Sequence, residues 1–548
     1  MGFIANKVQQ LTLSDRYNIL TDREKKALDE SWAKPFAETI FPAIREERFA
    51  PLYSSNPATR PNTPVNLIVG SLIIKEFQEL TDDELRESLM FDIRLQYALH
   101  TTSHEEQPLS DRTFSRFRLR LYEYEQETGR DLMKEEIVHL GSRISELMNL
   151  KPKMKRMDSL MIASGCKDMT RLEVVYVTVS NLARAVHGAH GAELLAGMER
   201  YLREDDRNRV IYHNKAEERA SKIQGIIEDC AALLERLGDA GKELPEYALA
   251  ARLLEDQSYV DENGNRKARD NRDIAPTSLQ NPSDPDATYR RKKEEHHTGY
   301  VANVVETFDG KGNSVITDYS FKQNGHSDSE FCKEAIEAIA ASGEGTGDEP
   351  IVLVGDGSFA SRENSRLAQE NDIKLVTTAM TGPKPPEVIA DFEIDKEIRQ
   401  VLSCPAGNSP IRQSLSPATG NYRIVMEKNL CQNCPHRREC KAKMQAKSAV
   451  VNVTEGKVER ARVANNGSVT EEEYAKYRKA RNAVEAIPSV LRRKHEVDDM
   501  PVFGTMKSKL FFGFKIAAIN LQKLVKFTKT QLGNPQDKLN SLVPCTQM

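Results

Sequence analysis

Residues 350–357 constrain the fold most, because they read PIVLVGDG, an unbroken apolar run that ends in an acid. A short apolar run bounded by glycine and proline is typical of a buried β-strand. The pattern then predicts a helix over residues 362–371 and a second buried strand over residues 373–379. A chain with this alternation is expected to contain an α/β domain.

The segment before this run continues the α/β pattern. Residues 298–307 and 314–321 predict two strands of a hairpin, joined by the turn sequence DGKGN at 309–313. A helix is predicted over residues 327–341, followed by a Gly-rich loop at 342–349.

Helical patterns fill most of the first half of the chain. Residues 1–150 are predicted to be helical, and apolar residues from Leu67 to Phe77 precede a capping sequence at 81–84, as in a helix-turn-helix. A second helical section covers about 171–256, and a polar, turn-rich linker covers 257–286. Between the helical sections, the apolar and basic stretch at 151–162 has strand character and contains a single acid, Asp158.

Composition narrows the class of protein. Of the 548 residues 39% are hydrophobic, yet no apolar run reaches the roughly 18 residues of a membrane span, so we expect a cytoplasmic protein with no membrane partner. The net charge of -4 gives no general support for nucleic-acid binding, which must therefore rest on local patches.

Two local patches are basic. Residues 112–120 carry four arginines, among them Arg112, Arg116 and Arg118, which form either a phosphate-contacting face or a solvated helix face. Residues 492–529 carry an excess of lysine and arginine and predict a second DNA-facing surface. The alternative for part of this stretch is an amphipathic helix that packs its apolar face into the core.

Two acids stand out by their positions. Asp158 is the single acid of its stretch, and Asp356 ends an apolar strand. Asp158 and Asp356 are therefore candidate metal ligands, since a carboxylate in such a place costs free energy unless a cation balances it. An aspartate at a strand end that caps the next turn is the simpler alternative.

A third acid lies on a helix predicted over residues 474–493. Arg481, Glu485 and Arg492 share one face of that helix, and Pro488 is expected to limit or kink it after Glu485. Considered alone, this face would be a surface ladder of ion pairs.

Taken in order, these three acids resemble the Asp-Asp-Glu core of the DDE transposases of bacterial insertion sequences. The spacing Arg481-x3-Glu485-x6-Arg492 is similar to the family's Tyr-x2-Arg-x3-Glu-x6-Lys signature, with Arg478 where the family has tyrosine. Further similar motifs are Met157-Asp158-Ser159, Pro285-Asp286-Ala287, His297-Thr298-Gly299-Tyr300, Gly325-His326-Ser327-Asp328, Val354-Gly355-Asp356-Gly357-Ser358 and Ala517-Ala518-Ile519-Asn520-Leu521. Residues 64–97 and 113–118 resemble the family's helical N-terminal domain.

The resemblance implies an RNase H-like α/β core with insertions, preceded by an all-α domain. The expected divisions are a helical DNA-binding domain (1–150), the first core strand (151–165), a helical insertion and linker (166–286), the remainder of the sheet (287–400), a cysteine-rich insertion (401–460), and the catalytic Glu helix with a basic C-terminal helix (461–548).

The resemblance also implies chemistry. Asp158, Asp356 and Glu485 would together bind Mg²⁺ or Mn²⁺ for phosphoryl transfer, and Arg481 and Arg492 would hold a DNA phosphate. The implied partners are double-stranded DNA, at terminal inverted repeats and at the target, and further copies of the chain assembled on DNA. Such a bacterial enzyme would be cytoplasmic and would lie at the nucleoid when bound to DNA.

Four of the eight cysteines lie close together in sequence: Cys404, Cys431, Cys434 and Cys440. Four thiolates with one Cys-x2-Cys pair can hold a structural Zn²⁺, and the alternative is a set of free thiols.

The expected function is therefore DNA cleavage and strand transfer at the ends of an insertion sequence. The alternatives are a catalytically inactive DNA-binding protein derived from a transposase and a plain metal-dependent nuclease on the same fold.

Overall fold

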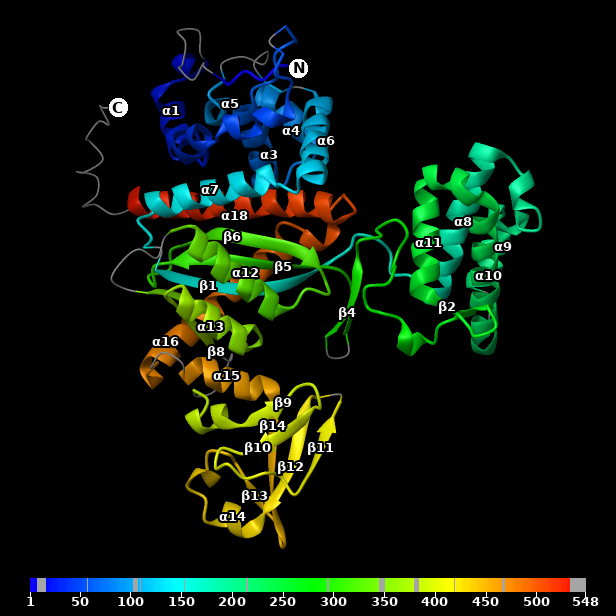
Figure 1. Ribbon diagram of the computed structural model, residues 1–548. Helices are drawn as coiled ribbons and strands as arrows, with labels where there is room; N and C mark the ends of the chain where they lie inside the picture. The colour runs from blue at the N-terminus through cyan, green and yellow to red at the C-terminus, as the bar shows by residue number, and fades with distance from the viewer. Residues whose placement is uncertain are drawn as a thin grey trace.

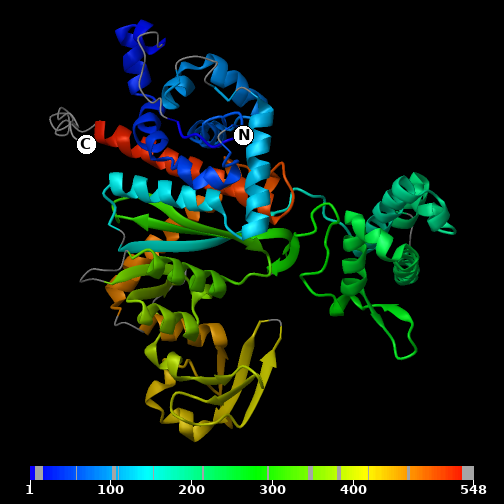
Figure 2. The same cartoon turned by 45° about the horizontal axis from the view of Figure 1, so that its top comes forward.

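The fold is given by a computed structural model (Figures 1 and 2). It describes residues 1–6, 16–56, 58–101, 107–108, 110–151, 153–212, 215–292, 295–343, 350–378, 384–417, 419–465 and 469–532. Most of the predicted Gly-rich loop and the last part of the predicted C-terminal division lie outside these residues. None of the described helices is long and apolar enough to cross a membrane.

A mixed six-stranded sheet forms the centre of the molecule. Its strands run in the order β4-β5-β1-β7-β8, and β6 pairs with β5 beside this path. β1 is antiparallel to β5 and parallel to β7, and β7 is parallel to β8. The bounds are β1 (Met154–Ala163), β4 (Thr288–Lys292), β5 (Glu295–Phe308), β6 (Ser314–Gln323), β7 (Ile351–Asp356) and β8 (Ile373–Thr378).

Helices cover both faces of this sheet (Figure 1). Met157, Val301 and Leu353 pack on the side of α12 (Asp328–Ala341) and α13 (Arg362–Glu370). On the other face, the strands β1, β5 and β6 pack against α7 (Leu132–Leu147) and α18 (Thr505–Leu532). Because apolar residues of β1 and β5 alternate between these two cores, these two strands are buried on both sides.

The helices that precede α7 in the chain form a group above α7 and α18 (Figure 1). They are α1 (Asp22–Asp29), α2 (Ala33–Pro35), α3 (Val65–Gln78), α4 (Asp82–Phe91), α5 (Ile93–Ala98) and α6 (Asp111–Thr128). Thr81 caps α4, and Glu84 completes the capping box, as the sequence predicts. The buried face of α3 lies against α18, so this group shares one core with the sheet.

A second group of helices follows β1 and stands to one side of the sheet (Figures 1 and 2). Its helices are α8 (Arg171–His190), α9 (Glu204–Ile211), α10 (Arg219–Leu237) and α11 (Pro245–Gln257). They enclose a core of their own. A short hairpin, β2 (Ser258–Val260) and β3 (Arg266–Ala268), begins the linker back to the sheet.

Residues 393–454 contain strands that the sequence pattern did not reveal. They extend from the end of the division predicted as remaining sheet (287–400) into the predicted cysteine-rich insertion (401–460). They are β9 (Glu393–Asp395), β10 (Gln400–Ser403), β11 (Arg412–Ser416), β12 (Asn421–Glu427), β13 (Lys443–Met444) and β14 (Ser448–Thr454), with α14 (Lys428–Gln432) between them. β11 to β14 form a separate four-stranded sheet, and β9 pairs with β10.

The helix predicted over residues 474–493 is interrupted. α15 (Glu455–Asn465) is followed by α16 (Glu471–Asn482), a 3₁₀ turn η14 (Ala483–Glu485) and α17 (Ala486–Arg493). Pro488, in the first turn of α17, has no N–H to donate to the carbonyl of Val484, so the α-helical hydrogen bond is absent at this point.

Candidate active site

Asp158 lies in the middle of β1, the central strand of the sheet. Its side chain is 9% exposed. The parallel pairing of β1 with β7 sets Arg156 opposite Val354. Two residues further along each strand, the same register brings Asp158 level with Asp356 on one face of the sheet.

Asp356 is the last residue of β7 and is 41% exposed at its side chain. Its Oδ1 atom accepts a hydrogen bond from the backbone N–H of Ser358 at 3.2 Å, so it also caps the short turn that follows. The simpler interpretation of a strand-end aspartate is therefore correct, but it accounts for only one of the two carboxylate oxygens.

Glu485 reaches the same place from η14, and Arg481 joins all three acids. Arg481 Nη2 lies 2.9 Å from Glu485 Oε1, 3.1 Å from Asp356 Oδ2 and 3.8 Å from Asp158 Oδ1. The guanidinium is 3% exposed, whereas Glu485 is 42% exposed. The predicted face of Arg481 and Glu485 is thus not a surface ladder, since it faces the middle of β1 and the end of β7.

The electrostatics of this cluster follow from the crowding of three carboxylates. Burial, together with repulsion from Glu485 and Asp356, raises the pKa of Asp158 to about 7, although Arg481 opposes the rise. A divalent cation would relieve the same repulsion, and carboxylate oxygens are the ligands that Mg²⁺ prefers.

The three carboxylates are chemically suited to bind a divalent metal ion. The guanidinium of Arg481 occupies the point where they converge and supplies a positive charge there. As the side chains lie, no group of three or more His, Cys, Asp or Glu residues within the described part of the chain is arranged to hold a metal ion. For the three acids the reason is visible, because a nitrogen of Arg481 lies between them.

Arg156 is a residue of this site that the sequence reasoning missed. It lies two residues before Asp158, donates from Nη1 to the carbonyl of Ala480 at 2.9 Å, and pairs with the fully buried Glu306 at 2.6 Å. Glu306 is also paired with Lys523 of α18. This chain of buried charges fixes α16 to the sheet one residue before Arg481, and the sequence signal was a basic residue inside an apolar strand.

The other predicted phosphate contacts lie in different environments. Arg492 donates to the carbonyl of Met161 at 2.7 Å and pairs with Asp498 at 3.2 Å, so it lies at the far end of β1. Arg112 and Arg116 are exposed on α6. Arg118 is instead held by Asp82 in a two-pronged ion pair of 2.7 and 2.9 Å.

The four clustered cysteines lie together in the small domain around β12 and β14. All four are free and partly exposed, and Cys404, Cys431 and Cys440 contact the core of that domain. Burial raises the pKa of Cys440 to about 12, and the neighbouring thiols of Cys434, Cys404 and Cys431 contribute to the rise.

Two family models match the chain. One, described as a transposase DDE domain, matches residues 403–525, which include the cysteines, Arg481 and Glu485. The other, described as a transposase domain (DUF772), matches residues 25–120 of the N-terminal helices. No curated protein and no solved structure matches the chain. The two matches support a DDE transposase of insertion-sequence type, which confirms the resemblance seen in the motifs.

Proposed function

We propose that this protein is a transposase that cleaves and transfers DNA strands at insertion-sequence ends by metal-dependent phosphoryl transfer. The observation that carries the proposal is the convergence of Asp158, Asp356 and Glu485 on one cation at the centre of the sheet. Three antiparallel strands, β6, β5 and β1, continue into the parallel strands β7 and β8, an order consistent with an RNase H-like core. A nuclease would need no N-terminal transposase domain.

Each acid would contribute differently because its element differs. Asp158, on the central strand, would be the most fixed of the ligands, while Asp356 and Glu485 are half-exposed and lie at the solvent side of the site. When bound, Mg²⁺ or Mn²⁺ would activate the attacking water or 3′-hydroxyl and stabilise the leaving oxygen. Arg156 keeps α16 against β1, so that Glu485 stays within reach of the two aspartates.

DNA would contact the N-terminal helices through arginine. Arg60, Arg112, Arg116 and Arg120 line a cavity of about 670 Å³ whose described lining contains no carboxylate. Four cations without an acid suit the phosphates of a DNA backbone. The proposed partners are the terminal inverted repeats, the target DNA and other copies of the chain, in the bacterial cytoplasm.

A structural zinc ion is a separate part of the proposal. Cys404 and Cys434 each precede a proline and begin a tight turn, closed by hydrogen bonds from the N–H groups of Gly407 at 2.7 Å and Arg437 at 3.2 Å. The thiols of Cys431 and Cys440 lie near those of Cys404 and Cys434, and four neighbouring thiols suit Zn²⁺.

The proposal is tested with the full chain and a labelled duplex that carries the ends of the DNA element encoding it. We expect nicking at those ends with Mg²⁺ or Mn²⁺, none with EDTA, and joining of the freed 3′ end to a second duplex. Binding without cutting would instead identify a catalytically inactive DNA-binding protein, and equal cutting of every duplex would identify a nuclease.

A further inference from the structure

Arg481 has an unusual position for a basic residue in a DNA-cutting site. It is 3% exposed, and one nitrogen, Nη2, meets all three acids at 2.9, 3.1 and 3.8 Å. Its Nε and Nη1 atoms are buried without a hydrogen-bond partner among the described residues. The guanidinium therefore contacts the acids through Nη2 alone, and its Nε and Nη1 donors have no hydrogen-bond acceptor among the described residues.

This arrangement is electrostatically incomplete. If all three carboxylates are ionised, one guanidinium leaves a net charge of -2 at the site. A buried donor with no partner is also costly, so the contact is a poor permanent solution for the arginine. Both defects would be removed if a divalent cation took the place of Nη2 and the side chain turned away.

The site is open to an incoming ion on one side. Asp356 and Glu485 are 41% and 42% exposed, so the site is open on their side, while Asp158 closes it from the sheet. Arg481 is the last long side chain before η14, where the helix changes to a 3₁₀ turn. By contrast, Arg156 is fixed on both sides, by Glu306 and by the carbonyl of Ala480.

We propose that Arg481 is an exchangeable counter-ion, which holds the three acids together in the metal-free chain and competes directly with the divalent ion for them. This inference rests on the proposed function, because it assigns the acids to metal binding. It makes Arg481 a positioning residue whose loss strengthens metal binding, whereas a purely structural role predicts that its loss weakens metal binding.

The test is Mn²⁺ binding to the full chain without DNA, followed by the electron paramagnetic resonance signal of free Mn²⁺. Arg481→Gln removes the competing charge, and Lys479→Gln is the matched control, because it removes one exposed charge from the same helix. We expect Arg481→Gln to bind Mn²⁺ at least about ten-fold more tightly than the native chain, since a competing unit charge is removed. Lys479→Gln should bind as the native chain does. Equal or weaker binding by Arg481→Gln would overturn the inference.

A second measurement keeps the inference testable if Arg481→Gln is unfolded in the absence of metal. The rise in melting temperature on adding Mn²⁺ is compared between the native chain, Arg481→Gln and Arg481→Lys. We expect the largest rise for the glutamine variant and a native-like rise for the lysine variant, which keeps the cation. A rise no larger in Arg481→Gln than in the native chain contradicts the inference. Neither measurement involves DNA cleavage, so a native chain that cuts DNA but fails these tests would overturn only this inference.

Discussion

His495 is a buried titratable residue that the proposed chemistry does not use. It follows α17, is 3% exposed and lies near Lys515 and Lys494. Burial, assisted by the charges of the two lysines, lowers its pKa to about 4. Because the unfolded chain binds this proton near pH 6.5, the contribution of His495 to stability is full above that pH and is lost as the pH falls towards 4.

We therefore expect acid to destabilise the native chain more than the variant His495→Gln, which cannot take up the proton. Between pH 7 and pH 4.5 the native chain should lose about 2–3 kcal/mol more free energy of unfolding than the variant. Urea unfolding at several pH values measures this difference. A gap between the two proteins that stays constant with pH would show that His495 is not held neutral.

At the scale of single residues, the sequence indicated which residues belong to the site but not which way their side chains point. The acids Asp158, Asp356 and Glu485 could be chosen because each lies in an ordered motif. The inward direction of Arg481 could not be predicted, since spacing alone gives Arg481 and Glu485 a shared face but not what that face contacts. The commitment of Arg118 to Asp82 likewise depends on a contact between α4 and α6.

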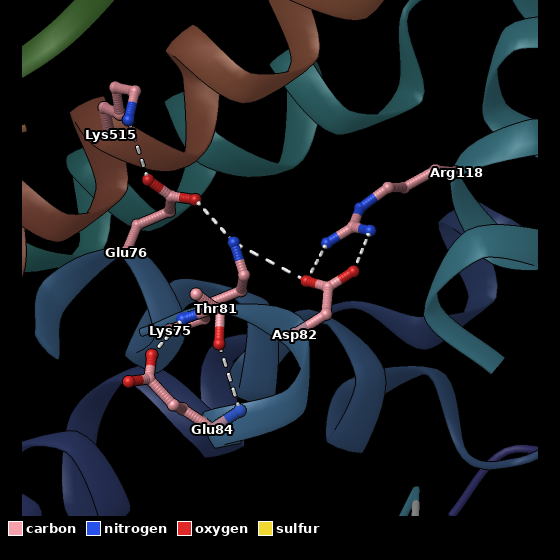
Figure 3. Close-up of polar contacts among 7 residues, drawn as sticks. All are labelled: Lys75, Glu76, Thr81, Asp82, Glu84, Arg118 and Lys515. Carbon is pink, nitrogen blue, oxygen red and sulfur yellow. Dashed lines mark hydrogen bonds and ion pairs between the residues drawn. The ribbon is translucent and has the colours of Figure 1, made fainter. Parts of the chain in front are cut away.

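The joint between α3 and α18 is held by a network of buried charges (Figure 3). Glu76 lies between Lys515 at 3.0 Å and Lys75 at 3.3 Å, and Lys75 also faces Asp82 at 3.5 Å. Burial would raise the pKa of Glu76, but the two ammonium groups lower it below its usual value. The N-terminal helices are thereby tied to the helix that packs on the sheet.

Glu76→Gln should destabilise the chain by about 3 kcal/mol, because it leaves Lys75 and Lys515 buried with too little negative charge. Glu79→Gln is the control, since Glu79 is 50% exposed and its pair with Lys494 spans 3.6 Å. We expect the control to cost less than about 1 kcal/mol. Thermal unfolding of both variants measures the effect, and equal costs would show that the network adds nothing beyond an exposed pair.

The small domain allows a direct test of the zinc proposal. We expect the purified chain to contain one zinc ion per molecule by elemental analysis, and Cys434→Ser to lose most of it. Cys166→Ser is the control, because Cys166 lies in a different part of the chain, after β1. A native chain without zinc, or a variant that keeps it, would leave Cys404, Cys431, Cys434 and Cys440 as free thiols.

Elements were predictable where the pattern was strong. The hairpin of β5 and β6, the helices α12 and α13, and the strands β7 and β8 lie close to their predicted positions because their apolar periodicity is clear. The sheet of β11 to β14 was missed, since its two edge strands give little signal: β11 is largely exposed and β13 has only two residues. In such strands pairing with neighbours outweighs local propensity.

At the scale of the whole molecule, the arginines of α6 divide into two kinds. Arg112 and Arg116 are exposed and line the basic cavity, whereas Arg118 is engaged with Asp82. We expect the variant with both Arg112→Gln and Arg116→Gln to bind duplex DNA more weakly. The salt slope of binding should fall by about one unit for each phosphate that is no longer neutralised by an arginine. Fluorescence anisotropy at several salt concentrations measures this slope.

Arg118→Gln is the comparison for that experiment. It should lower the melting temperature while leaving the salt slope of DNA binding nearly unchanged, because its charge is already neutralised by Asp82. A reduced slope for Arg118→Gln and an unchanged one for the double variant would place the DNA on a different face of α6.

The central claim is that three acids from distant parts of the chain form one active site. It is tested most directly by metal-dependent cleavage and strand transfer on the end-bearing duplex, with Asp158→Asn, Asp356→Asn and Glu485→Gln compared with the native chain. Glu473→Gln, an acid of α16 outside the cluster, is the control. We expect each of the three to lose activity by a factor on the order of 10³ while DNA binding persists, and the control to stay active. Cleavage by the three variants at the native rate would contradict the claim.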